Sequence, residues 1–142
     1  MNKFVIYFLL SLVIISTVQC ARRSLPTGGL KDTLPPLMVN ASPKMNTVFF
    51  DKEKITITFD EYIKLVDLTK QLIISPPIES GNYKVKPQGT VSKRIQIDLM
   101  DSLLDNTTYT FNFGESIIDN NEGNKLSFFN YAFSTGAIID SL

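Results

Sequence analysis

The alternation of apolar and polar side chains is strong near the C-terminal end of the chain. Tyr109, Phe111 and Phe113 alternate with threonine and asparagine, which is the two-residue period of a strand with one buried face. A stretch rich in turn residues follows, and the alternation resumes with Tyr131 and Phe133. We predict an antiparallel hairpin within residues 106–135 whose aromatic side chains form the centre of the core.

Shorter segments upstream show the same period. Ile55, Ile57 and Phe59 alternate with threonines, and Asp60 with Glu61 is expected to end that strand. Alternation or a short apolar run predicts further strands at residues 37–43, 71–75, 83–86 and 94–99, with residues 48–50 extending the first of them after a turn. Helical turns fit residues 62–68 and 101–104. Short strands between turn signals predict an all-β, antiparallel sandwich rather than a helical or α/β fold.

Leu103 and Tyr109 flank a turn at residues 105–107, directly before the aromatic strand. This spacing resembles the tyrosine corner of immunoglobulin-like and fibronectin-like sandwiches, in which the phenol hydroxyl bonds to upstream backbone and holds the crossover between the sheets. Alternatively, Tyr109 is one more aromatic residue of the core. Both interpretations give Tyr109 a structural role.

The N-terminal residues have the pattern of an export signal. Lys3 precedes the apolar run 4–18, which at about fifteen residues is shorter than the roughly twenty that a spanning helix needs. Cys20, the one cysteine of the chain, follows almost at once. The combination resembles a bacterial lipoprotein signal, which implies that the Cys20 thiol accepts a diacylglycerol. Thr17 and Gln19 differ from the residues that usually precede such a cysteine, so an uncleaved anchor and a free exported thiol remain alternatives.

These features divide the chain into four parts. We predict a signal peptide at residues 1–19, a flexible, lipid-anchored tether at 20–36, the sandwich at 37–136, and a C-terminal extension or the start of a further segment at 137–142. The tether contains prolines, glycines and paired arginines with almost no periodic apolar residues. Every interpretation of the leader places the sandwich outside the cytoplasm.

Composition excludes several classes of function. The chain has 14 basic and 14 acidic residues, so it lacks the basic excess of a nucleic-acid-binding protein. The absence of histidine excludes a Ser-His-Asp triad, a Cys-His pair and an imidazole zinc site. Paired carboxylates could still support glycoside hydrolysis, but most lie at strand ends and turns, where aspartate is common for backbone reasons. The candidates are Asp60, Glu61, Asp101, Asp105, Glu115 and Asp119. We predict no catalytic site and no cofactor.

Residues 119–123 offer the oxygen ligands and the glycine that calcium loops contain, with Asp119 and Asn121 as candidate ligands. The glycine is one position too early for an EF-hand loop, and no glutamate follows at the twelfth position. A hairpin loop that uses asparagine and glycine for positive φ explains the same residues. We therefore expect a plain turn and no metal site.

Several short motifs occur in a familiar order, at residues 32–36, 40–43, 57–61 and 118–124. Together they resemble the bacterial Ig-like domain of the S-layer SbsA type, in the version carried by lipoproteins of Bacteroidota. The resemblance implies a β-sandwich on a lipid-anchored envelope protein, without catalytic residues. It also draws attention to residues 32–34, which look like the Asp, Thr, apolar signal for O-glycosylation in these bacteria and make Thr33 a candidate acceptor. Residues 101–103 and 140–142 carry similar triplets.

Two pairs of adjacent aromatic residues, Phe49-Phe50 and Phe128-Phe129, must each place one ring outside if they lie in strands. An exposed ring can pack against another protein or stack on sugar, unless a neighbouring loop or a following domain covers it. The chain has no tryptophan, so we rank protein contact before sugar binding.

The sequence as a whole predicts a non-enzymatic, lipid-anchored cell-envelope protein whose Ig-like domain serves as a spacer or protein-interaction module. We expect it at the outer membrane of a Gram-negative bacterium, held through its N-terminal lipid and in contact with another envelope protein or a following domain. The alternative is a carbohydrate-binding or polysaccharide-processing accessory lipoprotein. Nucleic acid is not an expected partner.

Overall fold

The computed structural model describes residues 3–5, 7 and 29–140. The chain divides into two units, Met1–Leu30 and Lys31–Leu142, and the second unit contains the strands described below. Cys20, the predicted signal peptide apart from residues 3–5 and 7, and most of the predicted tether lie outside the described residues. None of the helices among the described residues is long and apolar enough to cross a membrane.

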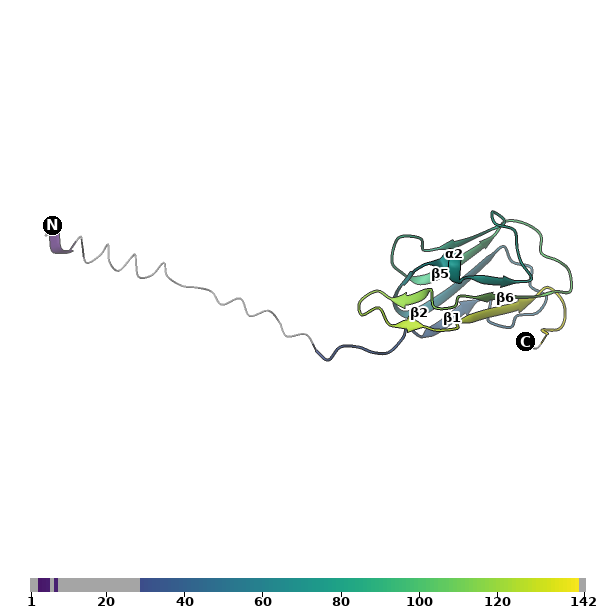
Figure 1. The fold of residues 1–142 in the computed structure, drawn as a ribbon, viewed down its shortest axis with the longest axis horizontal. Coiled ribbons are helices and arrows are strands. Elements are labelled where there is room, and N and C mark those ends of the chain that lie inside the picture. The colour runs from purple at the N-terminus through teal and green to yellow at the C-terminus, as the bar shows by residue number, and fades with distance from the viewer. Residues whose placement is uncertain (1–2, 6, 8–28, 141–142) are drawn as a thin grey trace. The chain divides into compact units, whose positions relative to one another are not determined.

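The second unit consists of short strands and one helical turn (Figure 1). In chain order they are β1 (Met38–Ser42), β2 (Lys54–Leu65), α2 (Leu68–Gln71), β3 (Ile73–Ser75), β4 (Tyr83–Lys86), β5 (Ser92–Leu99), β6 (Thr108–Asn112), β7 (Ile117–Asp119), β8 (Lys125–Leu126) and β9 (Asn130–Ser134). Each of the predicted strands therefore has a counterpart in the structure, although some bounds differ from those predicted.

The strands form two antiparallel sheets. One has the order β4-β5-β2-β7-β8, with β1 also paired to β2, and the other has the order β3-β6-β9. Strands β1, β2, β5 and β4 correspond to A, B, E and D of an immunoglobulin-like sandwich, and β3, β6 and β9 correspond to C, F and G. The predicted fold class, an all-β Ig-like sandwich, is confirmed.

The core lies between the two sheets because each sheet buries one alternating face. The fully buried side chains include the three predicted for β6 and its end, Tyr109, Phe111 and Phe113, at 3%, 0% and 0% exposure. The Phe133 ring lies at the centre of an aromatic cluster, with ring centroids 4.0 Å from Phe50 and 5.6 Å from Tyr109. The isoleucines of β2 and β5 cover the cluster from the other sheet; they are Ile55, Ile57, Ile63, Ile95 and Ile97.

The predicted aromatic hairpin exists, but its connection is more than a loop. Strand β6 pairs with β9 in the register Thr108↔Ser134 to Asn112↔Asn130. Between them the chain crosses to the other sheet, where β7 pairs with both β2 and β8. Burial of Ile117 at 0% exposure favours this excursion, because the apolar residue finds a place in the core only through the second sheet.

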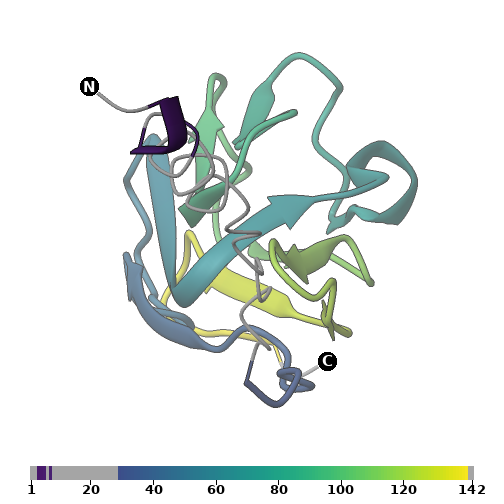
Figure 2. The ribbon, with the colours of Figure 1, turned by 90° about the vertical axis from the view of Figure 1, so that its left-hand side faces the viewer.

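Strand β2 is longer than predicted. Asp60 and Glu61 do not end it, because the Asp60 backbone N–H donates to the Leu37 carbonyl at 3.0 Å and Asp60 Oδ1 accepts the Leu37 N–H at 2.9 Å. The pairing register shifts between Thr58 and Ile63, and Figure 2 shows the bend of β2 there. The first half of β2 pairs with β1 and β5, and the second half pairs with β7.

Three other local predictions were wrong. Residues 62–65 belong to β2, so the predicted helical turn at 62–68 is replaced by α2 at Leu68–Gln71, and residues 101–104 are not helical. Residues 48–50 do not extend the first strand, because this segment crosses to β9, where Phe50 N–H donates to Ser134 O at 2.9 Å.

Candidate functional site

The residues of the predicted tyrosine corner lie at the start of β6. The Tyr109 ring is buried, and its hydroxyl oxygen accepts a hydrogen bond from the Leu104 backbone N–H at 3.0 Å. Leu103 packs against the core beside it. The partner of the hydroxyl is thus an upstream backbone donor. The arrangement holds the β5-to-β6 crossover.

A hollow of about 810 Å³ opens beside this crossover. Its apolar lining consists of Phe50, Leu99, Met100 and Leu103. Its rim carries four carboxylates, namely Asp51, Glu53, Asp101 and Asp105. Asp51 pairs with Lys52 at 2.7 Å, which lowers the pKa of Asp51 through the hydrogen bond and charge of that ammonium. The hollow concentrates negative charge at this end of the sandwich.

Asp119, the first calcium candidate, uses its carboxylate to hold the β7–β8 turn. Its side chain is fully buried, Oδ1 accepts the N–H groups of Glu122 and Gly123 at 2.6 and 3.1 Å, and Oδ2 accepts that of Asn124 at 2.7 Å. Burial alone raises the pKa of Asp119, but these backbone bonds outweigh it and leave the pKa below its ordinary value. The side chain of Asn121 accepts a hydrogen bond from Asn120 at 3.4 Å.

The carboxylates weighed for catalysis differ in their surroundings. Glu115 is in an ion pair with Lys125 at 2.7 Å. Burial and the nearby carboxylates of Asp119, Asp60 and Asp32 raise the pKa of Glu61, which reflects a crowded acidic surface around the β7–β8 turn. Within residues 29–140, no group of three His, Cys, Asp or Glu side chains is arranged to hold a metal ion.

The outer face of β4, β5 and β2 carries several basic side chains. Cross-strand register places Lys84 and Lys54 on either side of Asp98, Lys86 beside Gln96, and Arg94 beside Thr58. These residues share one face because successive side chains in a strand point to opposite sides. We call this surface the basic face, and it consists of Lys54, Thr56, Thr58, Lys84, Lys86, Arg94, Gln96 and Asp98.

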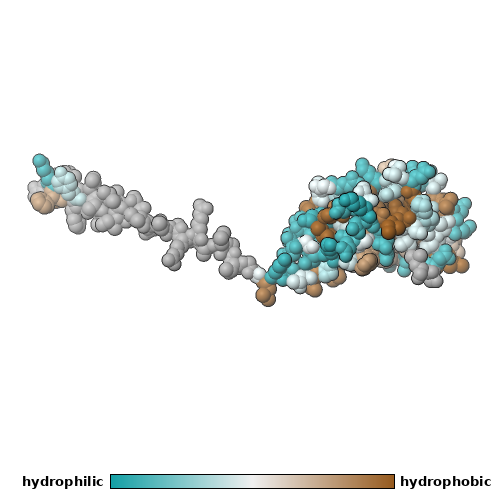
Figure 3. Space-filling model, viewed as in Figure 1, coloured by the Kyte–Doolittle hydropathy of each residue, from teal (hydrophilic) through white to brown (hydrophobic). Residues whose placement is uncertain are grey.

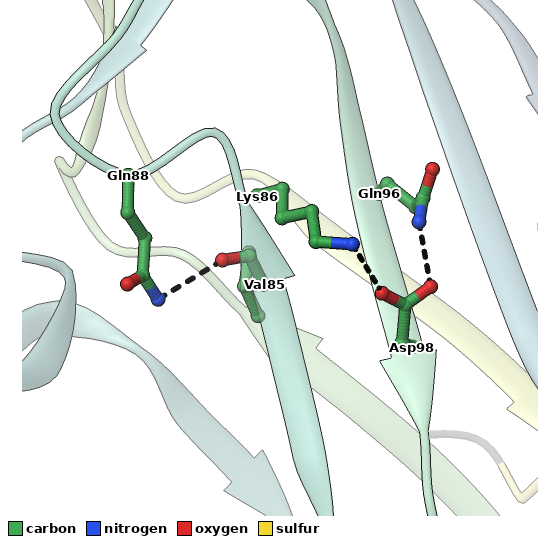
Figure 4. A network of polar contacts seen from close by, with 5 residues as sticks. All are labelled: Val85, Lys86, Gln88, Gln96 and Asp98. Carbon is green, nitrogen blue, oxygen red and sulfur yellow. Dashed lines mark hydrogen bonds and ion pairs between the residues drawn. The ribbon is translucent and has the colours of Figure 1, made fainter.

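One network of polar contacts organises the basic face (Figure 4). Lys86 Nζ donates to Asp98 Oδ2 at 2.9 Å, and Gln96 Nε2 donates to Asp98 Oδ1 at 2.6 Å. The hydrogen bond from Lys86 lowers the pKa of Asp98, although partial burial opposes it. Both oxygens of this carboxylate are therefore engaged. The sequence showed the alternating Lys84, Lys86 and Arg94, but only the strand order shows that they meet on one surface.

Each aromatic pair places one ring inside and one outside, although none of the four residues lies in a strand, which was the condition of the prediction. Phe50 is buried, and Phe49 is 68% exposed. Phe128 is 73% exposed, and Phe129 is half-buried against the core. Phe49 and Phe128 sit in turns with φ of 50° and 58°, at opposite ends of β9. Figure 3 also shows apolar side chains interspersed with polar ones on the face that carries α2.

Thr33, the candidate O-glycosylation site, is exposed. Asp32 Oδ1 accepts the N–H of Leu34 at 2.9 Å, so the triplet forms a small Asx turn with the threonine at its centre. The backbone carbonyl of Asp32 accepts a hydrogen bond from Asn124 Nδ2 at 3.2 Å, which ties this turn to the β7–β8 connection.

Comparison with protein families finds one match relevant to this geometry. The model of a bacterial Ig-like domain matches residues 32–135, which includes every strand of both sheets. The match begins five residues before the predicted start of the sandwich at residue 37 and includes the Thr33 turn. A search of curated proteins finds no match. The match indicates that the domain is a structural or interaction module.

Proposed function

Because the chain belongs to the bacterial Ig-like domain family, we propose that it is a non-enzymatic, lipid-anchored protein of the cell envelope. Its Ig-like domain serves as a spacer or protein-interaction module at the outer membrane of a Gram-negative bacterium. The observation that carries this proposal is the order of features in the sequence. An apolar leader is followed by the one cysteine, Cys20, and the Ig-like domain begins only twelve residues later, at Asp32.

Lipid on Cys20 explains this order physically. Each methylene group buried in the bilayer contributes about 0.8 kcal/mol, so two or three acyl chains hold a protein on a membrane without a spanning helix. The short segment between Cys20 and the domain then keeps the sandwich close to the membrane surface. A module in that position acts by contact and spacing.

Replacement of the acceptor tests the anchor. In Cys20→Ser the apolar run 4–18 is intact, so export continues while diacylglycerol transfer and lipoprotein-specific cleavage stop. We expect wild-type protein, but not the variant, to incorporate radioactive palmitate and enter the detergent phase. Gln19→Ala is the matched control, because it supplies a small residue before the cysteine and should label at least as well as wild type. Wild-type protein that takes up no palmitate and retains its leader contradicts the proposal.

The two exposed rings support the interaction role. Phe49 and Phe128 gain little from burial, and a left-handed backbone costs a residue with a side chain about 1 to 2 kcal/mol. Folding alone therefore favours asparagine or glycine at both positions. A large ring kept at a strained, exposed turn therefore supports a role in contact with a partner protein.

Phe49→Asn tests this interpretation through two opposite effects. The substitution is expected to raise the urea midpoint, because asparagine tolerates positive φ better, and to reduce contact with the envelope partner. A photo-crosslinking residue at position 49 should give a defined adduct in cells, and the same residue at exposed position 70 of α2 is the control. A lower midpoint for Phe49→Asn means that the ring serves folding, and the interaction argument then fails at this position.

A further inference from the structure

Charge is distributed unevenly over the domain. Without Lys3, Arg22 and Arg23, the 14 basic residues of the chain become 11 against 14 acidic ones, a net charge of −3 for residues 31–142. The carboxylates gather around the β7–β8 turn and around the hollow beside the crossover. The basic face instead carries four cations, Lys54, Lys84, Lys86 and Arg94, and one carboxylate, Asp98. An excess of positive charge on one surface of an acidic domain indicates a dedicated contact with an anion.

Three of these cations are available to a ligand. Lys86 is engaged by Asp98, but no ion pair forms for Lys54, Lys84 or Arg94 with any residue among 29–140. Lys84 and Arg94 are exposed. A hollow of about 600 Å³ runs between them over β4 and β5, lined by Lys84, Lys86, Pro87, Gln88, Thr90, Ser92, Arg94 and Gln96. The surface therefore combines positive charge with a concave shape.

Neutral polar groups fill the spaces between the cations. Thr56 and Thr58 follow one another along β2, and Gln96 lies between Thr56 and Lys86 in the cross-strand register. The Gln96 amide nitrogen is bonded to Asp98, and its carbonyl oxygen points away from that carboxylate (Figure 4). The basic face thus offers hydroxyl and amide groups at the regular spacing of a sheet, with cations at intervals.

We propose that the basic face binds an acidic polysaccharide, in which carboxylate groups alternate with hydroxyl-rich sugar rings. Lys54, Lys84 and Arg94 pair with the carboxylates, and the threonines and Gln96 bond to the hydroxyls. A nucleic acid fits less well, because the domain has a net negative charge and its basic face has no aromatic side chain on which bases could stack. An anionic membrane fits less well because none of the eight residues of the basic face has an apolar side chain that could enter the lipid.

Fluorescence anisotropy of labelled galacturonate oligomers tests the proposal with the full chain in a non-ionic detergent. Wild-type protein should bind the oligomers, bind neutral dextran oligomers of the same length much more weakly, and lose affinity between about 50 and 200 mM salt as screening increases. The variant Lys84→Glu with Arg94→Glu should lose affinity at least about tenfold. The matched control is Lys31→Glu with Lys70→Glu, which changes the net charge equally at exposed positions outside the basic face and should retain wild-type affinity.

A gain of affinity provides a test that misfolding cannot imitate. Asp98→Asn removes the one carboxylate of the basic face and releases Lys86, so this variant should bind galacturonate oligomers about two- to tenfold more tightly. Equal affinity for dextran, or equal losses in the two charge-reversal variants, overturns the proposal. Micelles doped with phosphatidylglycerol that displace the oligomers in wild type but not in the Lys84→Glu, Arg94→Glu variant reassign the surface to a membrane. The outcome does not depend on whether Cys20 carries lipid.

Discussion

Tyr109 is the residue whose single polar atom has the clearest structural role. Its hydroxyl accepts the N–H of Leu104 at 3.0 Å while the ring fills the core. Tyr109→Phe keeps the ring and leaves that N–H without its protein partner, so we expect a loss of about 1 kcal/mol in the free energy of unfolding. Urea denaturation followed by fluorescence measures it. Tyr83→Phe is the control, because Tyr83 also packs against the core but its Oη makes no hydrogen bond to any described residue. Equal midpoints for the two variants would mean that Tyr109 contributes only the packing of its ring.

At the residue scale, the sequence predicted which side chains face inward but not what their polar atoms meet. The two-residue period was sufficient to predict burial of Phe111 and Ile57, because alternation in a strand fixes the face of every side chain. It could not distinguish Phe49 from Phe50, since that choice depends on a positive φ and on the crossing to β9. The partner of the Tyr109 hydroxyl likewise depends on the path of residues 100–107, which has no periodic pattern.

Among the elements, the contact between α2 and the start of the β6–β7 connection depends on one glycine. Gly114 has φ of +56°, and a Cβ added there would lie 2.5 Å from Gln71 Oε1 and 3.2 Å from the Gln71 carbonyl oxygen. Gly114→Ala combines an unfavourable backbone conformation with this collision, so we expect a loss of about 1 to 3 kcal/mol. Thermal unfolding measures it. Gly89→Ala, also at positive φ but in open space, is the control, and equal losses would mean that the contact with Gln71 contributes nothing.

Strand β2 and helix α2 show why element boundaries were predicted less well than element types. Residues 62–65 contain no strict alternation, and their strand conformation follows from pairing of Ile63 with Asp119 and Leu65 with Ile117. That pairing joins segments more than fifty residues apart, so local sequence cannot indicate it. Tertiary contact overrides local propensity here, and α2 begins only where the contact with β7 ends.

The β7–β8 turn should make stability depend on pH through Asp119. The pKa of its carboxyl is lowered in the folded state, so its contribution is present above the unfolded pKa, near 3.8, and is lost as the pH falls through the folded value. Asp119→Asn replaces one accepting oxygen with a donor facing Asn124 N–H, and we expect a loss of about 2 kcal/mol near neutral pH. Urea midpoints from about pH 6 to pH 2 should show the wild type approaching the variant as acid is added.

Two controls accompany this measurement. Asp105→Asn alters an exposed carboxylate and should leave the acid dependence unchanged. Calcium should leave the wild-type midpoint unchanged, because both Asp119 oxygens already accept backbone N–H groups. A rise of several degrees in the melting temperature that a chelator reverses would contradict the interpretation of residues 119–124 as a plain turn.

At the scale of the whole molecule, the sequence was sufficient for the class of fold and insufficient for its surfaces. The basic face requires that β4, β5 and β2 be neighbours in one sheet, with Lys84 opposite Asp98 and Asp98 opposite Lys54. These residues lie 14 to 44 positions apart in the chain, and nothing in the alternation specifies their register. The family resemblance indicates the sandwich, whereas the charges of the basic face lie on outward positions whose residue types the core does not dictate.

The extent of the folded unit is the property of the whole molecule on which further experiments depend. Pro36 is buried and Asp32 O accepts a hydrogen bond from Asn124, so part of the segment predicted as a tether contacts the sandwich. We expect a domain that begins at Lys31 and one that begins at Leu37 both to fold as β structure, because the two sheets lie entirely beyond residue 37. The shorter domain should be less stable by about 1 to 2 kcal/mol, since it loses the burial of Pro36 and one hydrogen bond. Far-ultraviolet circular dichroism measures the secondary structure of the two domains, and urea midpoints measure their stability. A spectrum dominated by helix would refute the fold. Equal midpoints would mean that residues 31–36 do not stabilise the sandwich and act only as a tether.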